Sequence, residues 1–153
     1  MSGPDDPYGL ERFLTAQEET YEAALAELRR GRKTSHWMWF VFPQLRGLGR
    51  SPTAQRYAVS GLDEARAYLV HPVLGPRLDA CTQALLELAA DLRRAGRQPD
   101  PVTVLGPVDA TKLRSSMTLF ARAAPGPGPF TAVLDEWFAG EHDPATLGRL
   151  PPG

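Results

Sequence analysis

The stretch LGPRLDACTQALLELAADL, residues 74–92, decides the fold class of this 153-residue chain. Its apolar side chains recur at alternating steps of four and three residues, at Leu74, Leu78, Cys81, Leu85, Leu88 and Leu92. This spacing places them on one face of an α-helix. The stretch therefore predicts a long amphipathic helix whose apolar face packs against other helices.

Helical spacing extends to both sides of this stretch. Upstream, an apolar stripe is made by Leu10, Phe13, Leu14, Tyr21, Leu25 and Leu28. Gly31 follows where a helix would end, and Gln17 lies on the stripe, where its amide either hydrogen-bonds within the core or faces a pocket. Further helices are expected over 63–69, ended by His71 and Pro72, over 109–120, capped by Asp109, and over 130–138.

The run from Trp37 to Phe42 is apolar at every position, so its spacing does not separate a strand from a buried helix. A strand needs a partner, and the other short β-prone run is Val102 to Leu105. We therefore expect a helical turn that ends at Pro43. Residues 44–52, 96–101 and 124–130 are predicted to be loops or linkers. Together these features predict an all-α, compact, single-domain multihelical bundle of about six helices over residues 10–150, preceded by a disordered or loosely packed N-terminus over 1–9.

The composition is that of a folded protein, with 42% hydrophobic residues, 23% charged residues and a formal net charge of −1. No apolar run approaches the roughly 18 residues that span a membrane, and the first residues, MSGPDDPYG, do not resemble a secretory signal. The one cysteine, Cys81, excludes an internal disulfide. We therefore expect a reduced, cytoplasmic protein without membrane contact.

The stretch KTSHWMWFVFPQLRGLGRS, residues 33–51, combines aromatic side chains with positive charge. The window from Arg29 to Arg56 holds seven Lys or Arg residues and no Asp or Glu. Fifteen of the 17 basic residues are arginine, and only Lys33 and Lys112 are lysines. Such a surface suits a ligand that is flat, anionic or both.

The first candidate cluster consists of Lys33, His36, Trp37, Trp39 and Gln44. In the functional interpretation the tryptophans stack on a ring, Lys33 holds an anion and His36 moves a proton; Lys33 and His36 are the candidate catalytic residues. In the structural interpretation the aromatic residues are core side chains and His36 makes one structural hydrogen bond.

The second cluster is the loop that contains Arg46, Gly47, Gly49, Arg50 and Ser51. Glycines allow the backbone to approach a phosphate closely, and arginine binds oxyanions with two parallel hydrogen bonds. No recognised nucleotide-binding motif is present, and the alternative is a flexible basic loop.

The third cluster consists of Asp109, Lys112, Arg114, Ser115 and Ser116. Two cations near a helix N-terminus favour an anion site. The alternative is a capped helix whose charges are solvated. Metal binding and a nucleophilic triad are not predicted, because the chain has three histidines, one cysteine and no GxSxG motif. No cofactor is predicted either.

Three long strings resemble one known family. They are GRKTSHWMWFVFPQLRGLGRSP (31–52), AYLVHPVLGPRL (67–78) and DATKLRSSMTLF (109–120), and they are similar to the uncharacterised bacterial family called domain of unknown function 1810. The resemblance extends from about Leu10 to Leu150 and implies a compact multihelical domain, but no activity. Some members are named calpastatin; that name does not fit, because calpastatins are disordered repeats.

The leading functional hypothesis is a pocket for a phosphorylated or otherwise anionic small molecule, such as a nucleotide derivative. One alternative is a nucleic-acid or protein interaction module that uses the basic 29–56 surface, although a pI near 6.3 is not typical of nucleic-acid binders. Another is a non-catalytic oligomeric scaffold whose aromatic run forms the subunit interface. The sequence sets neither the reaction nor the oligomeric state.

Overall fold

The computed structural model describes residues 6–151, which form ten α-helices and no strand. In chain order they are α1 (Glu11–Glu18), α2 (Tyr21–Arg30), α3 (Met38–Val41), α4 (Pro52–Arg56), α5 (Leu62–Val70), α6 (Leu74–Arg94), α7 (Pro101–Leu105), α8 (Pro107–Ala123), α9 (Pro129–Phe138) and α10 (Pro144–Arg149). The predicted all-α class is confirmed. The predicted number of about six helices is wrong.

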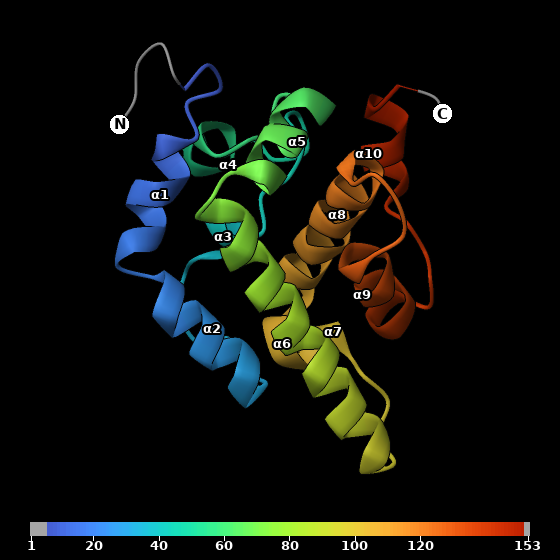
Figure 1. Cartoon of the computed structure of the whole chain (residues 1–153). Coiled ribbons are helices and arrows are strands. Elements are labelled where there is room, and N and C mark those ends of the chain that lie inside the picture. Colours follow the sequence, from blue (N-terminus) through green and yellow to red (C-terminus); the bar gives the residue numbers. More distant parts are fainter. Residues whose placement is uncertain (1–5, 152–153) are drawn as a thin grey trace.

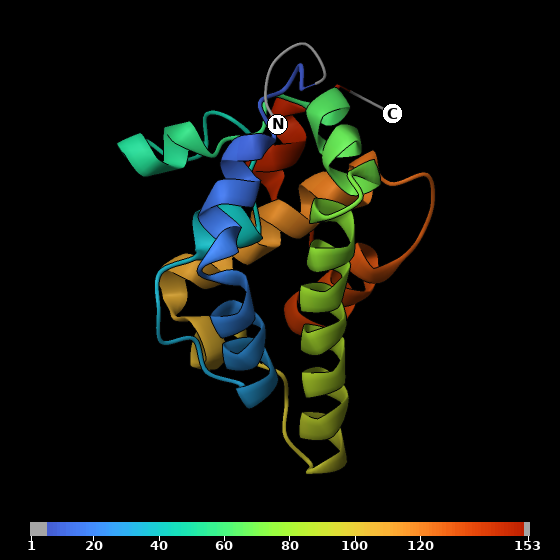
Figure 2. The same cartoon turned by 60° about the vertical axis from the view of Figure 1, so that its left-hand side comes forward.

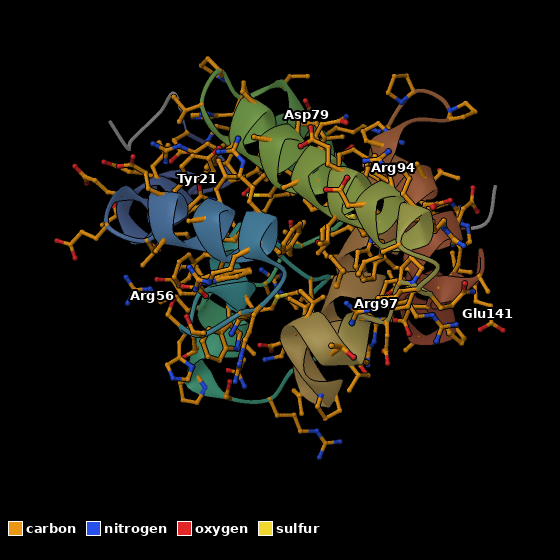
Figure 3. All side chains as sticks on the ribbon, turned by 90° about the horizontal axis from the view of Figure 1, so that it is seen from below. Tyr21, Arg56, Asp79, Arg94, Arg97 and Glu141 are labelled. Atoms are coloured by element: carbon orange, nitrogen blue, oxygen red, sulfur yellow. The ribbon has the colours of Figure 1, made fainter. Side chains whose placement is uncertain are left out.

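The long helix α6 lies between two groups of helices (Figure 1). It packs against α2 on one side and α9 on the other, while α8 packs against α5, α7, α9 and α10. The C-terminal end of α6 extends beyond the neighbouring helices, and α4 projects from the body of the molecule (Figure 2). Seen from below, α2 and α6 lie next to each other with α7 on the same side of the molecule (Figure 3).

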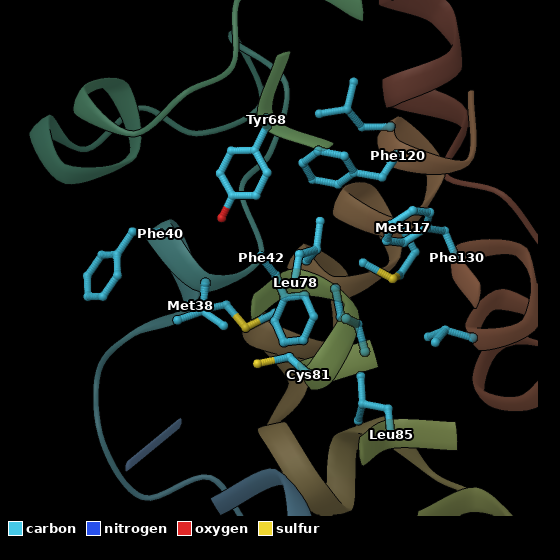
Figure 4. Packing of buried hydrophobic residues seen from close by; sticks show 14 of the residues in the cluster. Met38, Phe40, Phe42, Tyr68, Leu78, Cys81, Leu85, Met117, Phe120 and Phe130 are labelled. Carbon is cyan, nitrogen blue, oxygen red and sulfur yellow. The ribbon is translucent and has the colours of Figure 1, made fainter. Parts of the chain in front are cut away.

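One continuous hydrophobic core joins these helices. The stripe on α6 behaves as predicted: Leu74, Leu78, Cys81 and Leu85 are buried, and Leu88 and Leu92 pack against the core with partial exposure. Figure 4 shows Leu78, Cys81 and Leu85 among aromatic and methionine side chains from other helices. Burial raises the pKa of the Cys81 thiol to about 12, so this cysteine stays protonated at neutral pH.

Several predicted helix ends are confirmed. Gly31 follows α2 in the left-handed region, with φ 82°, which glycine adopts without strain. The helix α5 ends at Val70, before His71 and Pro72. The apolar run at Trp37 to Phe42 contains the predicted helical turn, α3, which ends before Pro43.

The predicted cap at Asp109 is wrong, because α8 begins two residues earlier, at Pro107, with Gly106 as its N-cap. The helices α4, α7 and α10 were not predicted. They have five, five and six residues, and this is too short for helical spacing to show. Each begins with proline directly after Ser51, Asp100 or Asp143, whose side chain accepts a backbone hydrogen bond.

The predicted loose N-terminus over 1–9 lies partly outside the described residues, which begin at Asp6. The Asp6 carboxylate accepts hydrogen bonds from the backbone amides of Leu10 (2.8 Å) and Glu11 (3.0 Å), at the start of α1. Within residues 6–151, none of the helices has both the length and the apolar character needed to span a membrane.

Candidate functional site

A buried carboxylate, Glu27 of α2, holds the segment that leads to α3. It accepts hydrogen bonds from the backbone amides of Thr34 (2.7 Å) and Ser35 (3.0 Å), from the Ser35 hydroxyl and from Nε1 of Trp37 (2.9 Å). Burial by itself would raise the pKa of Glu27, but the hydrogen bonds outweigh it and lower the pKa to about 2. Glu27 is therefore a charged internal anchor at neutral pH, and Trp37 is part of the core.

The two lysines of the chain meet at one carboxylate. The Nζ atom of Lys33 lies 2.8 Å from Oδ2 of Asp109, and Nζ of Lys112 lies 3.6 Å from Oδ1. The side chains of Lys33, Asp109 and Lys112 are 9%, 18% and 20% exposed. The first and third clusters predicted from the sequence are therefore brought together, although about 80 residues separate their lysines.

Each of these lysines also lies against a tryptophan ring. The distance from Nζ to the ring centroid is 5.1 Å for Lys33 and Trp37, and 4.5 Å for Lys112 and Trp39. Trp37 is fully buried, whereas Trp39 stays partly exposed. We call Lys33, Trp37, Trp39, Asp109 and Lys112 the lysine–tryptophan site.

His36 and Gln44 belong to the first predicted cluster but take no part in these contacts. His36 is exposed, and its side chain makes no hydrogen bond or ion pair within residues 6–151. The backbone carbonyl of Gln44 accepts a hydrogen bond from the amide of Val59 (2.8 Å), and its partly buried side chain makes none in the same range. Both side chains are open to a ligand or to water.

The second cluster lies against α10. Arg46 and Arg50 are exposed, and Ser51 caps α4 by accepting a hydrogen bond from the amide of Ala54 (3.1 Å). The guanidinium group of Arg149 covers Gly47, since a Cβ atom there would lie 2.5 Å from its Nη1. Within the described part of the chain, no hydrogen bond or ion pair connects this loop to the lysine–tryptophan site.

Two members of the third cluster hold α10 on α8. Arg114 donates to the carbonyl oxygens of Glu141 (3.0 Å) and His142 (2.8 Å). The Ser115 hydroxyl donates to Oδ2 of the buried Asp143 (2.9 Å), which also caps α10. These contacts give Arg114 and Ser115 a structural role.

Ser116 differs from its neighbour. It is fully buried, and its Oγ atom is the one buried side-chain polar atom without a hydrogen-bond partner among residues 6–151. It lies one helical turn beyond Lys112 on α8, on the same face of that helix. A buried hydroxyl without a partner costs about 1–3 kcal/mol, so Ser116 is available to a ligand or a water molecule.

Glu27 was not identified as a site residue from the sequence, and Asp109 was placed in the third cluster as the cap of its helix, not as the partner of the two lysines. Glu27 is the last acidic residue before the window from Arg29 to Arg56, which has none. Asp109 precedes Lys112 by three residues, a spacing at which two side chains meet on a helix. The position of Glu27 before the basic window and the three-residue spacing of Asp109 and Lys112 were therefore both visible in the sequence.

Two surface hollows of about 340 Å³ lie away from the lysine–tryptophan site. One lies between the start of α1 and the end of α5, and the other is next to α9 and includes Arg114. Over the described range, no group of three or more His, Cys, Asp or Glu side chains is arranged to hold a metal ion.

Comparison with known proteins gives two matches of nearly full length. Residues 7–150 match the family described as Protein of unknown function (DUF1810), which confirms the resemblance seen in the sequence. The chain is also similar to the crystal structure of the conserved hypothetical protein Rv1873 from Mycobacterium tuberculosis, with 48% identity, a TM-score of 0.88 and coverage of 97% of this chain and 100% of that chain. No curated protein matches the sequence.

Proposed function

This chain belongs to the DUF1810 family of proteins of unknown function, and we propose that it binds a small anionic molecule with a flat ring at the lysine–tryptophan site. The ligand class that suits this site is a phosphorylated small molecule, with nucleotide derivatives as the first candidates. Whether the bound molecule is then converted depends on His36, the exposed titratable side chain three residues before Trp39.

The observation that carries the proposal is the convergence of Lys33 and Lys112 on Asp109. Two ammonium groups against one carboxylate leave a net charge of about +1. Asp109 also lies in the first turn of α8, where the helix dipole favours negative charge. The site therefore attracts an anion more strongly than a neutral ion pair would.

The two lysines have different roles in this proposal. Lys33 is nearly buried and has a short contact with Asp109, so it holds the carboxylate in place. Lys112 is more exposed and its contact with Asp109 is longer, so it can turn toward an incoming anion at low cost. A ring attached to that anion would lie beside the partly exposed Trp39.

The alternative of an oligomer that uses the aromatic run has less support. Trp37, Met38, Phe40, Val41 and Phe42 are all buried within the chain, and only Trp39 of this run is partly exposed. A nucleic-acid surface is favoured by one feature, the exposed Arg46, Arg50 and Arg149 around Gly47. The affinity for a nucleic acid should fall steeply as the salt concentration rises, and this distinguishes such a surface from binding at the lysine–tryptophan site.

A thermal-shift screen tests the proposal with nucleotides, sugar phosphates, inorganic phosphate and short oligonucleotides at low and moderate salt. A ligand at about 100 times its dissociation constant stabilises by roughly 2.7 kcal/mol, a shift of several degrees for a protein of this size. We expect a shift from a small phosphorylated ring compound that survives moderate salt and disappears in Lys112→Met.

The matched control is Arg94→Met. Arg94 pairs with Asp91 at the same three-residue spacing as Lys112 with Asp109, but on an exposed part of α6 without a tryptophan. This variant should respond to the ligand as the wild type does. Equal ligand responses in Lys112→Met and Arg94→Met would rule out the lysine–tryptophan site, and a shift by oligonucleotides alone that is lost in moderate salt would favour the interaction module.

A further inference from the structure

Three arginines, Arg12, Arg56 and Arg77, lie over aromatic rings, and the two that are partly buried, Arg12 and Arg77, differ in how their donors are used. Arg12 lies 4.4 Å from the centroid of the Phe13 ring and is fully engaged. Its Nε donates to the Arg56 carbonyl (2.8 Å) and its Nη1 to two carbonyls of residues 8–9 (2.7 and 2.9 Å), while its Nη2 donates to the Ala58 carbonyl (2.8 Å) and to Glu64 (2.7 Å). Arg12 is a saturated structural residue.

Arg77 of α6 has a similar setting but almost no partners. It is partly buried, and its Cζ lies 4.9 Å from the centroid of the Tyr21 ring. The one hydrogen bond of its guanidinium group within residues 6–151 is a long one, 3.4 Å from Nη1 to Oε1 of Gln17. It makes no ion pair with any carboxylate in residues 6–151. Most of its N–H donors therefore have no protein acceptor.

The groups around Arg77 are themselves fixed. The buried Gln17 donates through Nε2 to the Phe40 carbonyl (2.7 Å) and to the Tyr68 hydroxyl (3.0 Å), so its Oε1 is held toward Arg77. The Gln17 amide therefore hydrogen-bonds within the core through Nε2, while its Oε1 faces the cation Arg77. The two roles that the sequence left open for this amide, a core hydrogen bond or an orientation toward a pocket, are thus compatible.

A second arginine, Arg29, lies in the last turn of α2. Tyr21 lies between α2 and α6 in Figure 3. Burial and Cys81 raise the pKa of Tyr21, while the positive charges of Arg77 and Arg29 lower it in part. Arg29 is exposed at the end of α2, and its side chain makes no hydrogen bond or ion pair within the described residues.

We infer that Arg77 and the Tyr21 hydroxyl bind an oxyanion, a phosphate or a carboxylate group, between α2 and α6, and that Arg29 adds positive charge to this region. A partly buried cation without a carboxylate partner is costly, and an anion removes that cost. The guanidinium group offers two parallel donors that match an oxyanion, and stacking on Tyr21 fixes its plane. This site is formed by α2 and α6, whereas the lysine–tryptophan site uses α3 and α8.

The test is a titration of the full chain with inorganic phosphate and, separately, with acetate at constant ionic strength, followed by thermal unfolding. We expect a saturable rise in melting temperature that is absent in Arg77→Met and retained in Lys112→Met. Arg77→Lys keeps the charge but loses the planar fork, so its midpoint should move to on the order of tenfold higher anion concentration. The anion with the lower midpoint concentration, phosphate or acetate, indicates which of the two groups the ligand carries.

Arg29→Met is a second variant at an exposed position, where loss of folding is not expected. It should shift the midpoint several-fold, and it keeps the test decisive if Arg77→Met is too unstable to measure. Wild-type midpoints in both Arg77→Lys and Arg29→Met would overturn the inference, as would an equal rise with sodium chloride in place of the oxyanion. The anion response of Lys112→Met tests this site independently, because that variant lacks the lysine–tryptophan site but keeps Arg77.

Discussion

Trp37 and Trp39 are two residues apart, and they belong to different parts of the molecule. Trp37 is buried and donates to Glu27, whose carboxylate is also bonded to the amides of Thr34 and Ser35. Trp39 is partly exposed and meets Lys112, a flexible cation with a long contact to Asp109.

The two carboxylates explain this difference. Glu27 has rigid partners, three of them N–H groups of the 34–37 segment, and it is 5% exposed. Asp109 has only lysine ammonium groups as ion-pair partners in the described structure, and one of the two contacts is long. A buried carboxylate whose hydrogen bonds are all made fixes the chain, whereas a carboxylate paired with two lysines leaves positive charge that a ligand can use.

The largest effect is expected at Glu27. Glu27→Ala leaves the Trp37 Nε1 and two backbone amides without an acceptor, so we expect the free energy of unfolding to fall by about 3–5 kcal/mol. Glu27→Gln is the control, because it retains an acceptor oxygen and should lose clearly less. Urea unfolding of both variants measures the difference. A loss below about 1 kcal/mol in Glu27→Ala would show that Glu27 does not anchor this segment.

A smaller effect is expected from acid. The pKa of Glu27 in the folded protein is about 2, below its ordinary value of 4.5, so its carboxylate stabilises the fold above about pH 4.5, and this contribution is lost as the pH falls toward 2. Between pH 5 and 3 the wild type should lose about 2 kcal/mol more than Glu27→Gln, which lacks the titrating group. Parallel stability curves for the two proteins over this range would contradict the assignment.

The smallest effects are expected at the lysines, and they should be unequal. Lys33→Met removes a nearly buried ion pair of 2.8 Å and should cost about 1–2 kcal/mol. Lys112→Met removes a longer and more exposed contact and should cost less than about 0.5 kcal/mol. Thermal unfolding without ligand compares the two. Equal losses in the free energy of unfolding, or a larger loss in Lys112→Met, would mean that both lysines are structural. This result would contradict the proposal that Lys33 holds Asp109 while Lys112 binds the ligand.

The long helices could be predicted because their buried apolar residues recur along the chain at helical spacing. The stripe from Leu74 to Leu92 identified α6, and Gly31 identified the end of α2. The helices α4, α7 and α10 were not, because five or six residues do not complete two turns, and their formation depends on a proline and a single capping side chain. Asp109 was misplaced as a cap because Gly106 and Pro107 already begin α8.

The candidate site was predictable in part. The rarity of lysine singled out Lys33 and Lys112, and the structure joins them through Asp109. Ser115 and Ser116 look alike in the sequence, but one bonds to Asp143 and the other has no partner among the described residues. Adjacent helical residues point about 100° apart, so the contacts of one say little about the other.

The sequence by itself determined that this protein is all-α, which of its long segments are helices, and where its apolar faces lie. Those properties follow from spacing along the chain, which is local. Only the tertiary structure decided which polar groups are satisfied: Arg12 and Glu27 are, and Arg77 and Lys112 have donors to spare. Hydrogen bonds and ion pairs form over about 3–4 Å between residues far apart in the chain, so they depend on how the helices pack.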